Sequence, residues 1–282
     1  MPCDLHTHSV FSDGTYTPAQ LLDEAEALGL TAVALCDHNT VAGLPDFMAA
    51  AEGRKVTTIP GIEFSTDYGG VDLHIVALFV RKEHYAAVDE LMAQSQRRKE
   101  KSNIRLIEKL SAAGYRLDYE TLKNSTAGGF VNRAVIAAEL MERGYVSSVQ
   151  EAFEKLLAPK YGFYEPPKRP DSFEIIRFIR SIGAVAVLAH PFLNLDEQQL
   201  AVFLDKAVPE GLDAMEVLYS TYDEATTATA KEIAKRYGLL PSGGSDFHGM
   251  NKPDVALGSG RGNLNIPDEF WKAFAALARK RQ

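Results

Sequence analysis

Two histidines and an aspartate near the N-terminus form the first group of candidate functional residues. The stretch DLHTHSVFSDG holds His6 and His8 one residue apart, with Asp13 five positions further on. The alternation in MPCDLHTH fits a strand that aims its polar side chains to one side. Two imidazoles on one strand face, then a carboxylate and Gly14 where the loop must turn tightly, predict a metal site. An isolated His-x-His is about as often a pair of exposed strand residues, so the rest of the chain must decide.

Further polar residues of the same kinds lie in or after apolar, strand-like segments. They are His38 in TAVALCDH, Glu63 in KVTTIPGIEF, His74 in VDLHIVALFV, His190 in GAVAVLAHP, and Asp246 and His248 in GGSDFHG. Six of the seven histidines fall in such segments, the exception being His84. Alone, His38 would more often be a hydrogen-bonded core residue, and Glu63 could pair with a lysine. Together with the first group they make nine nitrogen and oxygen ligands, enough for two or three divalent ions if a carboxylate bridges.

Strand-like and helix-like segments alternate along most of the chain. In TYTPAQLLDEAEALGL, Thr17 is a suitable N-cap, Gln20 completes a capping box, Leu28 belongs to the apolar face and Gly29 ends the helix. Repeated alternation, with polar groups where strands end, favours an α/β barrel over an open doubly wound sheet. The dinucleotide signature Gly-x-Gly-x-x-Gly is absent after the first strand.

One stretch breaks this rhythm, because its successive helical patterns have no strands between them. The pattern predicts barrel segments over 1–85 and 169–282, separated by a helical insertion domain over 86–168. The prolines of YGFYEPPKRP mark the return to the barrel.

The composition is that of a globular protein: 282 residues, 46% of them hydrophobic, with a net charge of −8. The negative charge argues against a broad basic surface, so no stable binding of duplex DNA is expected. The two cysteines, Cys3 and Cys36, lie in apolar segments and are expected to be buried free thiols of a cytoplasmic protein. Neither a signal peptide nor a membrane span is predicted, and no Ser–His–Asp or Cys–His nucleophile arrangement is apparent.

The ordered motifs resemble those of the PHP (polymerase and histidinol phosphatase) family of metal-dependent phosphoesterases. The matching segments are DLHTHSVFSDG, LCDHNT, PGIEFS, HIVALF, AVLAHP and GGSDFHG. The resemblance implies a distorted (β/α)7 barrel, similar to a TIM barrel, with three metals at the carboxyl ends of its strands. It implies a first metal at His6, His8, Glu63 and Asp246, a second at Asp13, His38 and His248, and a third at Glu63, His74 and His190. Asp13, His38, Asp246 and His248 are expected to be catalytic as well.

This ligand set suits phosphoester hydrolysis, because closely spaced cations bind phosphate oxygens, generate hydroxide near neutral pH and stabilise the leaving oxygen. Nitrogen and oxygen ligands without cysteine permit manganese, iron or zinc and do not select among them. Asp4 and Asp37 either orient ligand imidazoles or merely satisfy backbone groups. Glu216 also ends a strand, but it is not included in the predicted site.

The insertion and its flanks are similar to those of PHP enzymes that include nucleoside 3',5'-bisphosphate phosphatases and short-RNA 5' exonucleases. In that group the insertion covers the metal site, the substrate is a small nucleotide phosphate or short RNA, and phosphate is a product. Arg133 resembles a phosphate-clamping arginine, its alternative being a charge on a helix surface. The other candidate substrate-binding residues are Asn103, Lys160, Tyr161 and Lys168, whereas RRKEK is expected to be a solvated helix face. Neither AHPFLNLD nor LYSTYDE supplies a further histidine or arginine to contact phosphate.

The expected function is therefore hydrolysis of a nucleotide phosphomonoester, foremost the 3'-phosphate of nucleoside 3',5'-bisphosphates. Within the family, 5'-3' exonuclease action on short RNA and histidinol phosphate hydrolysis are the alternatives. An amidohydrolase-type deaminase also opens with His-x-His, but typically lacks the late Asp-x-His. A catalytically silent module that binds metal for structure, or a partner through the insertion, is the non-enzymatic alternative.

Overall fold

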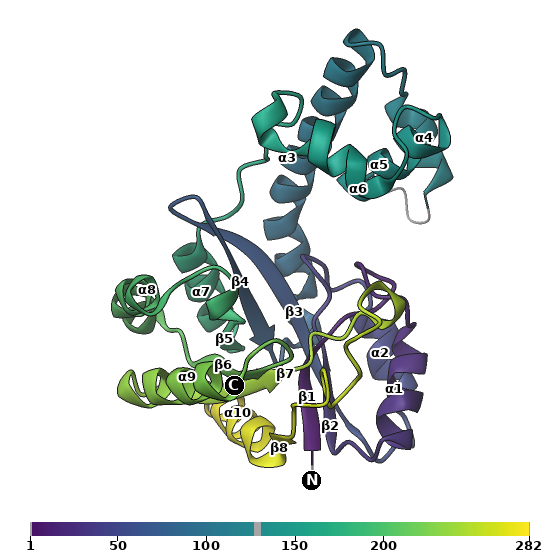
Figure 1. The fold of residues 1–282 in the computed structure, drawn as a ribbon. Coiled ribbons are helices and arrows are strands. Elements are labelled where there is room, and N and C mark those ends of the chain that lie inside the picture. Colours follow the sequence, from purple (N-terminus) through teal and green to yellow (C-terminus); the bar gives the residue numbers. More distant parts are fainter. Residues whose placement is uncertain (1, 127–130, 282) are drawn as a thin grey trace. The chain divides into compact units, whose positions relative to one another are not determined.

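The computed structural model describes residues 2–126 and 131–281 and divides the chain into two compact units (Figure 1). The chain up to Glu90 and from Arg169 onward forms the first unit, and Leu91–Lys168 forms the second. The insertion domain predicted over 86–168 stays a prediction in its boundaries, as does its role as a cover for the metal site.

A single sheet forms the centre of the first unit, in the order β7-β6-β5-β4-β3-β2-β1-β8. Its strands are β1 (Pro2–Thr7), β2 (Ala32–Leu35), β3 (Thr57–Tyr68), β4 (Val71–Leu78), β5 (Val185–Ala189), β6 (Ala214–Tyr219), β7 (Leu240–Gly244) and β8 (Ile266–Pro267). The segment after β7 returns to β1, where the Asp246 N–H donates to the His6 carbonyl at 2.9 Å. The sheet is thus nearly closed, which confirms the predicted barrel, and the two-residue β8 is added to seven longer strands.

Helices accompany the strands of the first unit and cover the outside of the sheet (Figure 1). They are α1 (Pro18–Ala27), α2 (Leu44–Ala50), α7 (Ser172–Ser181), α8 (Glu197–Glu210), α9 (Glu224–Arg236) and α10 (Asp268–Arg281). Phe274 of α10 belongs to the same buried apolar cluster as Leu5 of β1 and Val187 of β5. This cluster packs β1 and β5 against α10. Cys3 and Cys36 also belong to it, as buried free thiols.

The first helix shows how local sequence sets its own boundaries. Thr17 caps α1 and forms the predicted capping box with Gln20, while Gly29, with φ of 70°, follows the helix end. Leu22 is fully buried, as its place on the apolar face requires. The expectation for Leu28 was wrong: this residue is the C-cap, and 49% of it is exposed. The apolar pattern therefore continues one residue past the end of the helix, to a position that is not packed against the sheet.

Strand β4 departs from the parallel pattern, because Gly69 and Gly70 take positive φ and join β3 and β4 into an antiparallel hairpin. Since β4 also pairs antiparallel with β5, His74 lies level with Ala189, the last residue of β5. The first half of β4 therefore reaches the end of the barrel where the parallel strands terminate.

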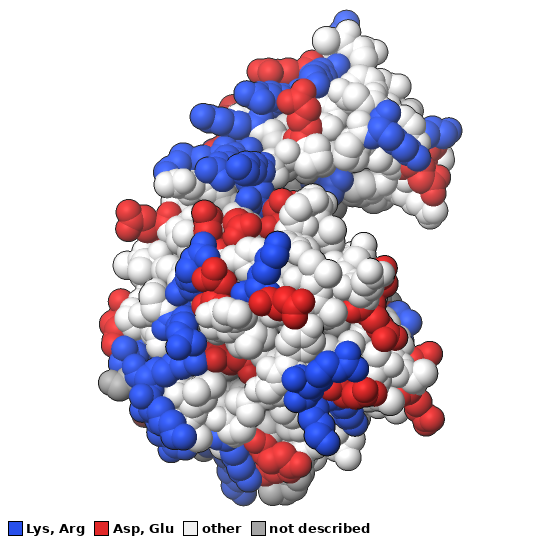
Figure 2. All heavy atoms as spheres, turned by 90° about the vertical axis from the view of Figure 1, so that its left-hand side faces the viewer, with Lys and Arg blue, Asp and Glu red and all other residues white. Residues whose placement is uncertain are grey.

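The second unit is helical. It contains α4 (Tyr119–Ser125), α5 (Arg133–Glu142), α6 (Val149–Ala152) and most of α3 (Tyr85–Ala112). Leu106, Ile136 and Leu140 lie in its own buried apolar cluster. Lysine and arginine side chains gather on the face of this unit that is in view in Figure 2, and the cations of RRKEK are exposed, as expected for a solvated helix face. Within the described ranges, no helix combines the length and apolar character that crossing a membrane requires.

Candidate metal centre

The nine predicted ligand residues lie together at one end of the barrel. They are His6 and His8 in or just after β1, Asp13 in the next loop, His38 after β2, Glu63 in β3, His74 in β4, His190 after β5, and Asp246 and His248 after β7. Among the described residues, three groups have ligand atoms within 4.8 Å of one another: His8, Asp13, His38 and His248; His6, His8, Glu63 and Asp246; and His38, Glu63 and His74. The third of these groups differs from the third metal site predicted from sequence, which contains His190 instead of His38. The assignment of ions to these residues stays a prediction.

Glu63 is at the centre of the cluster and is completely buried. Its carboxylate oxygens lie within 3.3 Å of nitrogen atoms of five imidazoles, those of His6, His8, His38, His74 and His190. Each oxygen of Glu63 faces a different set of nitrogen donors, so this carboxylate would supply a ligand atom to each of two ion sites.

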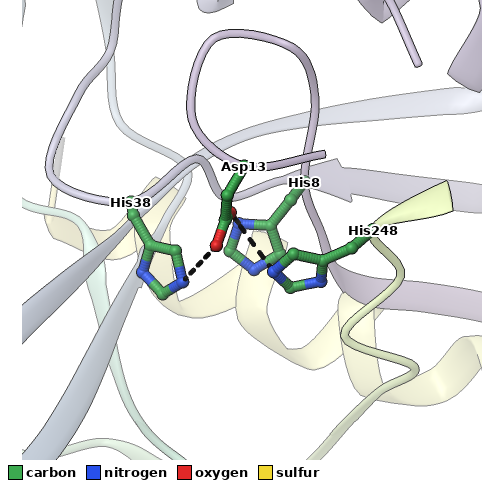
Figure 3. Close-up of side chains that lie close together, drawn as sticks. All are labelled: His8, Asp13, His38 and His248. Carbon is green, nitrogen blue, oxygen red and sulfur yellow. Dashed lines mark ion pairs between the residues drawn. The ribbon is translucent and has the colours of Figure 1, made fainter. Parts of the chain in front are cut away.

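Asp13 approaches the cluster from the loop after β1 (Figure 3). Its Oδ1 lies 3.2 Å from His248 Nε2, and its Oδ2 lies 3.8 Å from His38 Nε2. Gly14 makes this loop possible, because a Cβ atom at that position would lie 2.5 Å from the His8 carbonyl oxygen. The side chain of Asp13 is 54% exposed, whereas that of Glu63 is fully buried, so Asp13 marks the open side of the centre.

Asp246 divides its two oxygens between the cluster and the protein around it. Oδ1 lies 3.2 Å from His8 Nε2. Oδ2 accepts hydrogen bonds from the Tyr219 hydroxyl at 2.7 Å and from Lys252 Nζ at 2.6 Å. Asn39, directly after His38, has φ of 56°, His190 has φ of 28° and Asp246 has φ of 58°, so three of the loops that carry candidate ligands hold non-glycine residues in the left-handed region. Such backbone strain is typical of functional sites.

The chemistry of the donor atoms fits divalent ions. In the described part of the chain, His6 Nε2, both ring nitrogens of His8, His38 Nδ1 and Glu63 Oε2 are buried without a hydrogen-bond partner. Leaving a buried polar atom unpaired is costly, and here the unpaired atoms point at one another. Divalent ions held by these nitrogen and oxygen atoms would satisfy them together.

The local charges shift the pKa values of these groups in opposite directions. Burial opposes protonation of His8, yet its contacts with Asp246 and Glu63 raise its pKa to about 9. For His74, burial is likewise outweighed by the Glu63 and Asp72 carboxylates, which raise its pKa to about 10. Burial lowers the pKa of His38 to about 3. Burial would raise the pKa of Glu63, but the surrounding imidazoles bring it well below its usual range, so this carboxylate is ionised.

Glu216 is a further buried carboxylate at the centre, left out of the site predicted from sequence. Its Oε1 lies 2.9 Å from His6 Nδ1, and its Oε2 accepts the His190 backbone N–H at 2.6 Å. Its place near the end of the apolar segment LDAMEVL was the only local signal. Tyr219 and Lys252, which hold Asp246, were also missed, because their spacing in sequence forms no ligand pattern.

Asp4 and Asp37 hold loops rather than imidazoles. Asp4 accepts hydrogen bonds from the Ser245 backbone N–H at 2.9 Å and hydroxyl at 2.5 Å. Asp37 accepts the Ser9 N–H at 2.8 Å and the Ser12 hydroxyl at 2.6 Å. Of the two alternatives that the sequence left open, the contacts therefore favour satisfaction of backbone and hydroxyl groups, in the loops that carry Asp13 and Asp246.

The five predicted substrate-binding residues all lie in the second unit, and their roles stay predictions. The guanidinium of Arg133 lies 4.4 Å from the Tyr164 ring centroid and 5.7 Å from that of Phe153. Asn103 is buried, and its Nδ2 donates to the Val131 carbonyl at 2.8 Å, so its amide group already serves the fold. Lys160 Nζ lies 4.9 Å from the Tyr161 ring, and Lys168 is exposed at the end of the unit.

Comparison with known proteins adds to this geometry. Residues 4–164 match the PHP domain. A 5'-3' exoribonuclease of Haemophilus influenzae is 33% identical over 87% of this chain and 89% of its own. A 3',5'-nucleoside bisphosphate phosphatase of Chromobacterium violaceum is 29% identical over 97% of this chain and 96% of its own. The crystal structure of a protein from Bifidobacterium adolescentis, assigned to the metal-dependent phosphoesterases, superposes with a TM-score of 0.80 at 28% identity, covering 98% of each chain.

Proposed function

Because the chain belongs to the PHP family of metal-dependent phosphoesterases, we propose that it hydrolyses the 3'-phosphate of nucleoside 3',5'-bisphosphates. The cluster around Glu63 carries the hydrolytic part of this proposal, since a buried carboxylate surrounded by five imidazoles offers donor atoms that suit more than one divalent ion. The bisphosphate part is supported by a relative with that activity whose similarity spans both units. The products are inorganic phosphate and a nucleoside 5'-phosphate.

Two or three divalent ions of manganese, iron or zinc form the proposed cofactor. His6, His8, Glu63 and Asp246 would hold one ion, Asp13, His38 and His248 a second, and Glu63, His74 and His190 a third. The chemistry these ions would supply is Lewis-acid binding of phosphate oxygens and generation of hydroxide near neutral pH. Asp13, His38, Asp246 and His248 are the proposed catalytic residues among them.

Within the first unit, exposure of the side chains sets the direction from which a phosphate reaches the centre. The side chains of His6, His8 and Glu63 are fully buried, whereas those of His38 and His74 are 24% and 18% exposed. A phosphate group therefore enters on the side of His38, His74 and Asp13. Lys252, whose side chain is 39% exposed, holds the outer oxygen of Asp246 and adds a positive charge beside the cluster.

Arg133 is the proposed anchor for the phosphate that is not hydrolysed. It is the first residue of α5, directly after the N-cap Asn132, whose side chain accepts the Val135 N–H. The guanidinium of Arg133 lies over the Tyr164 ring, and a planar guanidinium of this kind can bind a phosphate in a bidentate manner through its N–H groups. A helix N-terminus adds to the positive potential at this position.

A second candidate function is 5'-3' exonuclease action on short RNA, which the Haemophilus influenzae relative favours. Both activities act on nucleotides, and neither requires duplex DNA. The proposed location is the cytoplasm, in keeping with two buried free cysteines.

A substrate panel at fixed metal content tests the proposal. The panel contains adenosine 3',5'-bisphosphate, a 5'-phosphorylated tetraribonucleotide, histidinol phosphate and adenosine as a deamination substrate. We expect the highest kcat/KM for the bisphosphate, with release of phosphate, and loss of activity after chelation that added metal restores. A higher kcat/KM for the oligonucleotide would favour the exonuclease, and turnover in fully metal-free protein would refute the metal mechanism. Metal binding without turnover of any compound would favour the silent module.

A further inference from the structure

We propose that Glu216 is a positioning residue. It fixes the orientation and the tautomer of the His6 imidazole, and it holds the backbone at His190 in place. The inference rests on the proposed ligation of metal by His6 and His190, and it adds a residue that is not a ligand itself. Glu216 lies in β6 and is only 1% exposed, so its carboxylate is held by its protein contacts.

The contacts assign a separate task to each nitrogen of His6. Nδ1 lies 2.9 Å from Glu216 Oε1. Nε2 lies 3.2 Å from Glu63 Oε2 and has no hydrogen-bond partner in the described ranges. One nitrogen thus contacts the carboxylate behind the site, and the other faces the cluster.

This division selects one tautomer of the imidazole. A carboxylate accepts hydrogen bonds and cannot donate them when ionised, so the contact with Glu216 requires the proton on Nδ1. The lone pair is then on Nε2, the atom that must supply it to a metal. Carboxylate partners of this kind orient ligand histidines and raise their basicity.

The second oxygen of Glu216 extends the effect to another candidate ligand. Oε2 accepts the backbone N–H of His190 at 2.6 Å, at a residue whose φ is 28°. The carboxylate therefore supports a strained backbone conformation immediately after β5. Its two oxygens join a side chain of β1 to the backbone after β5, although β6 is adjacent to β5 and not to β1.

A glycine in β7 allows β1 to come close enough for this arrangement. A Cβ atom at Gly244 would lie 2.2 Å from the Cβ atom of His6, so only a glycine fits there. Within the sheet, Glu216 is in register with Ser242 of β7. The glycines at the start of GGSDFHG thus allow the His6 backbone to take its position, and the same segment continues to Asp246.

Asp213 provides a matched control just before β6. Its Oδ2 accepts the Ala186 backbone N–H of β5 at 2.9 Å, and its carboxylate pairs with Arg281. Both carboxylates therefore hold a backbone N–H in or directly after β5. Asp213 has none of the candidate metal ligands among its contacts in the described part of the chain.

The test compares zinc affinity and the His6 ring in wild-type, Glu216→Gln and Asp213→Asn proteins. In Glu216→Gln the amide oxygen must accept the His190 N–H, because that donor cannot change. The amide NH2 then faces His6 Nδ1 and favours the tautomer whose proton is on Nε2. We expect about a 10- to 100-fold loss of zinc affinity, the range typical for such partners, by competition with a chromophoric chelator.

A spectroscopic signature separates positioning from general destabilisation. In zinc-saturated, 15N-labelled wild-type protein, His6 should show a slowly exchanging Nδ1–H resonance, identified by its loss in His6→Gln. Glu216→Gln should lose this slow exchange, whereas Asp213→Asn should keep it and the wild-type zinc affinity, even if its melting temperature falls. If Glu216→Gln does not fold, Glu216→Asp serves instead, because its shorter side chain cannot hold both partners.

The outcomes are distinguishable. Unchanged zinc affinity and Nδ1–H exchange in the Glu216 variant would overturn the inference while leaving the proposed metal centre intact. An equal loss of affinity in Asp213→Asn would also overturn it, since the effect would then come from destabilised strand packing. Failure of the wild-type protein to bind zinc, manganese or iron would instead refute the proposed function on which the inference rests.

Discussion

His74 Nδ1 lies 2.7 Å from Glu63 Oε1, although the two residues belong to neighbouring strands that run in opposite directions. In a fully parallel barrel, a residue in the first half of a strand would lie away from the end where ligands bind. The antiparallel β4 reverses that rule and brings His74 to the same edge as His190. The centre thus depends on one local reversal of strand direction.

Removal of a single candidate ligand should abolish turnover without unfolding the barrel. We expect His38→Ala and Asp246→Asn to lower kcat/KM for the bisphosphate by at least about 100-fold, because side chains at strand ends contribute more to metal binding than to the apolar core. His84→Ala is the control, since this histidine contacts Arg81 and lies outside the cluster. Metal content and far-UV circular dichroism are measured for each variant. If either ligand variant kept the kcat/KM of the wild-type protein, the proposed metal site would be contradicted.

Arg133→Ala should affect a bisphosphate more than a monophosphate. Loss of one partner of a buried charge pair costs about 2 to 5 kcal/mol. The fall in kcat/KM for adenosine 3',5'-bisphosphate should therefore correspond to a loss of about 2 to 5 kcal/mol in transition-state stabilisation. The loss for adenosine 3'-monophosphate should be much smaller. Arg143→Ala, at the other end of α5 and paired with Glu139, serves as the control. Equal losses on both substrates would argue against a phosphate anchor.

Metal affinity should increase as the pH rises from 6 toward about 9. The pKa of His8 is raised to about 9 and that of His74 to about 10, so both imidazoles carry protons at neutral pH in the metal-free chain. A ligand nitrogen must lose its proton before it binds metal, and binding therefore releases protons. Calorimetric titration in buffers of different ionisation enthalpy measures this release. A binding enthalpy independent of the buffer would show that no net release occurs.

Two leucines of the first helix segment should differ in their contribution to stability. Leu22 is fully buried, so Leu22→Ala should lower the free energy of unfolding by about 2 to 5 kcal/mol. Leu28 is 49% exposed, and Leu28→Ala should change it by no more than about 0.5 kcal/mol. Urea unfolding of the metal-free proteins checks both values. A large effect at Leu28 would indicate that this residue is packed in solution.

Features that depend on neighbours along the chain could be predicted from the amino-acid sequence. The capping box of Thr17 and Gln20 is such a feature, because its hydrogen bonds join residues three positions apart. The types of candidate ligand and their position near strand ends also follow from local patterns, as does the PHP family itself. The alternation of β1 was sufficient to separate His6 from the core residues Cys3 and Leu5.

Contacts between groups that are distant in sequence could be seen in the folded chain alone. Glu216 contacts His6, 210 positions away, because β6, β7 and β1 converge in the barrel and Gly244 permits their close approach. Lys252 and Tyr219 meet on one oxygen of Asp246 for the same reason. Leu28 lost its expected place in the core because the helix ends at Ala27, before the periodic pattern does. Such contacts depend on strand order and backbone direction, which no local pattern of residues contains.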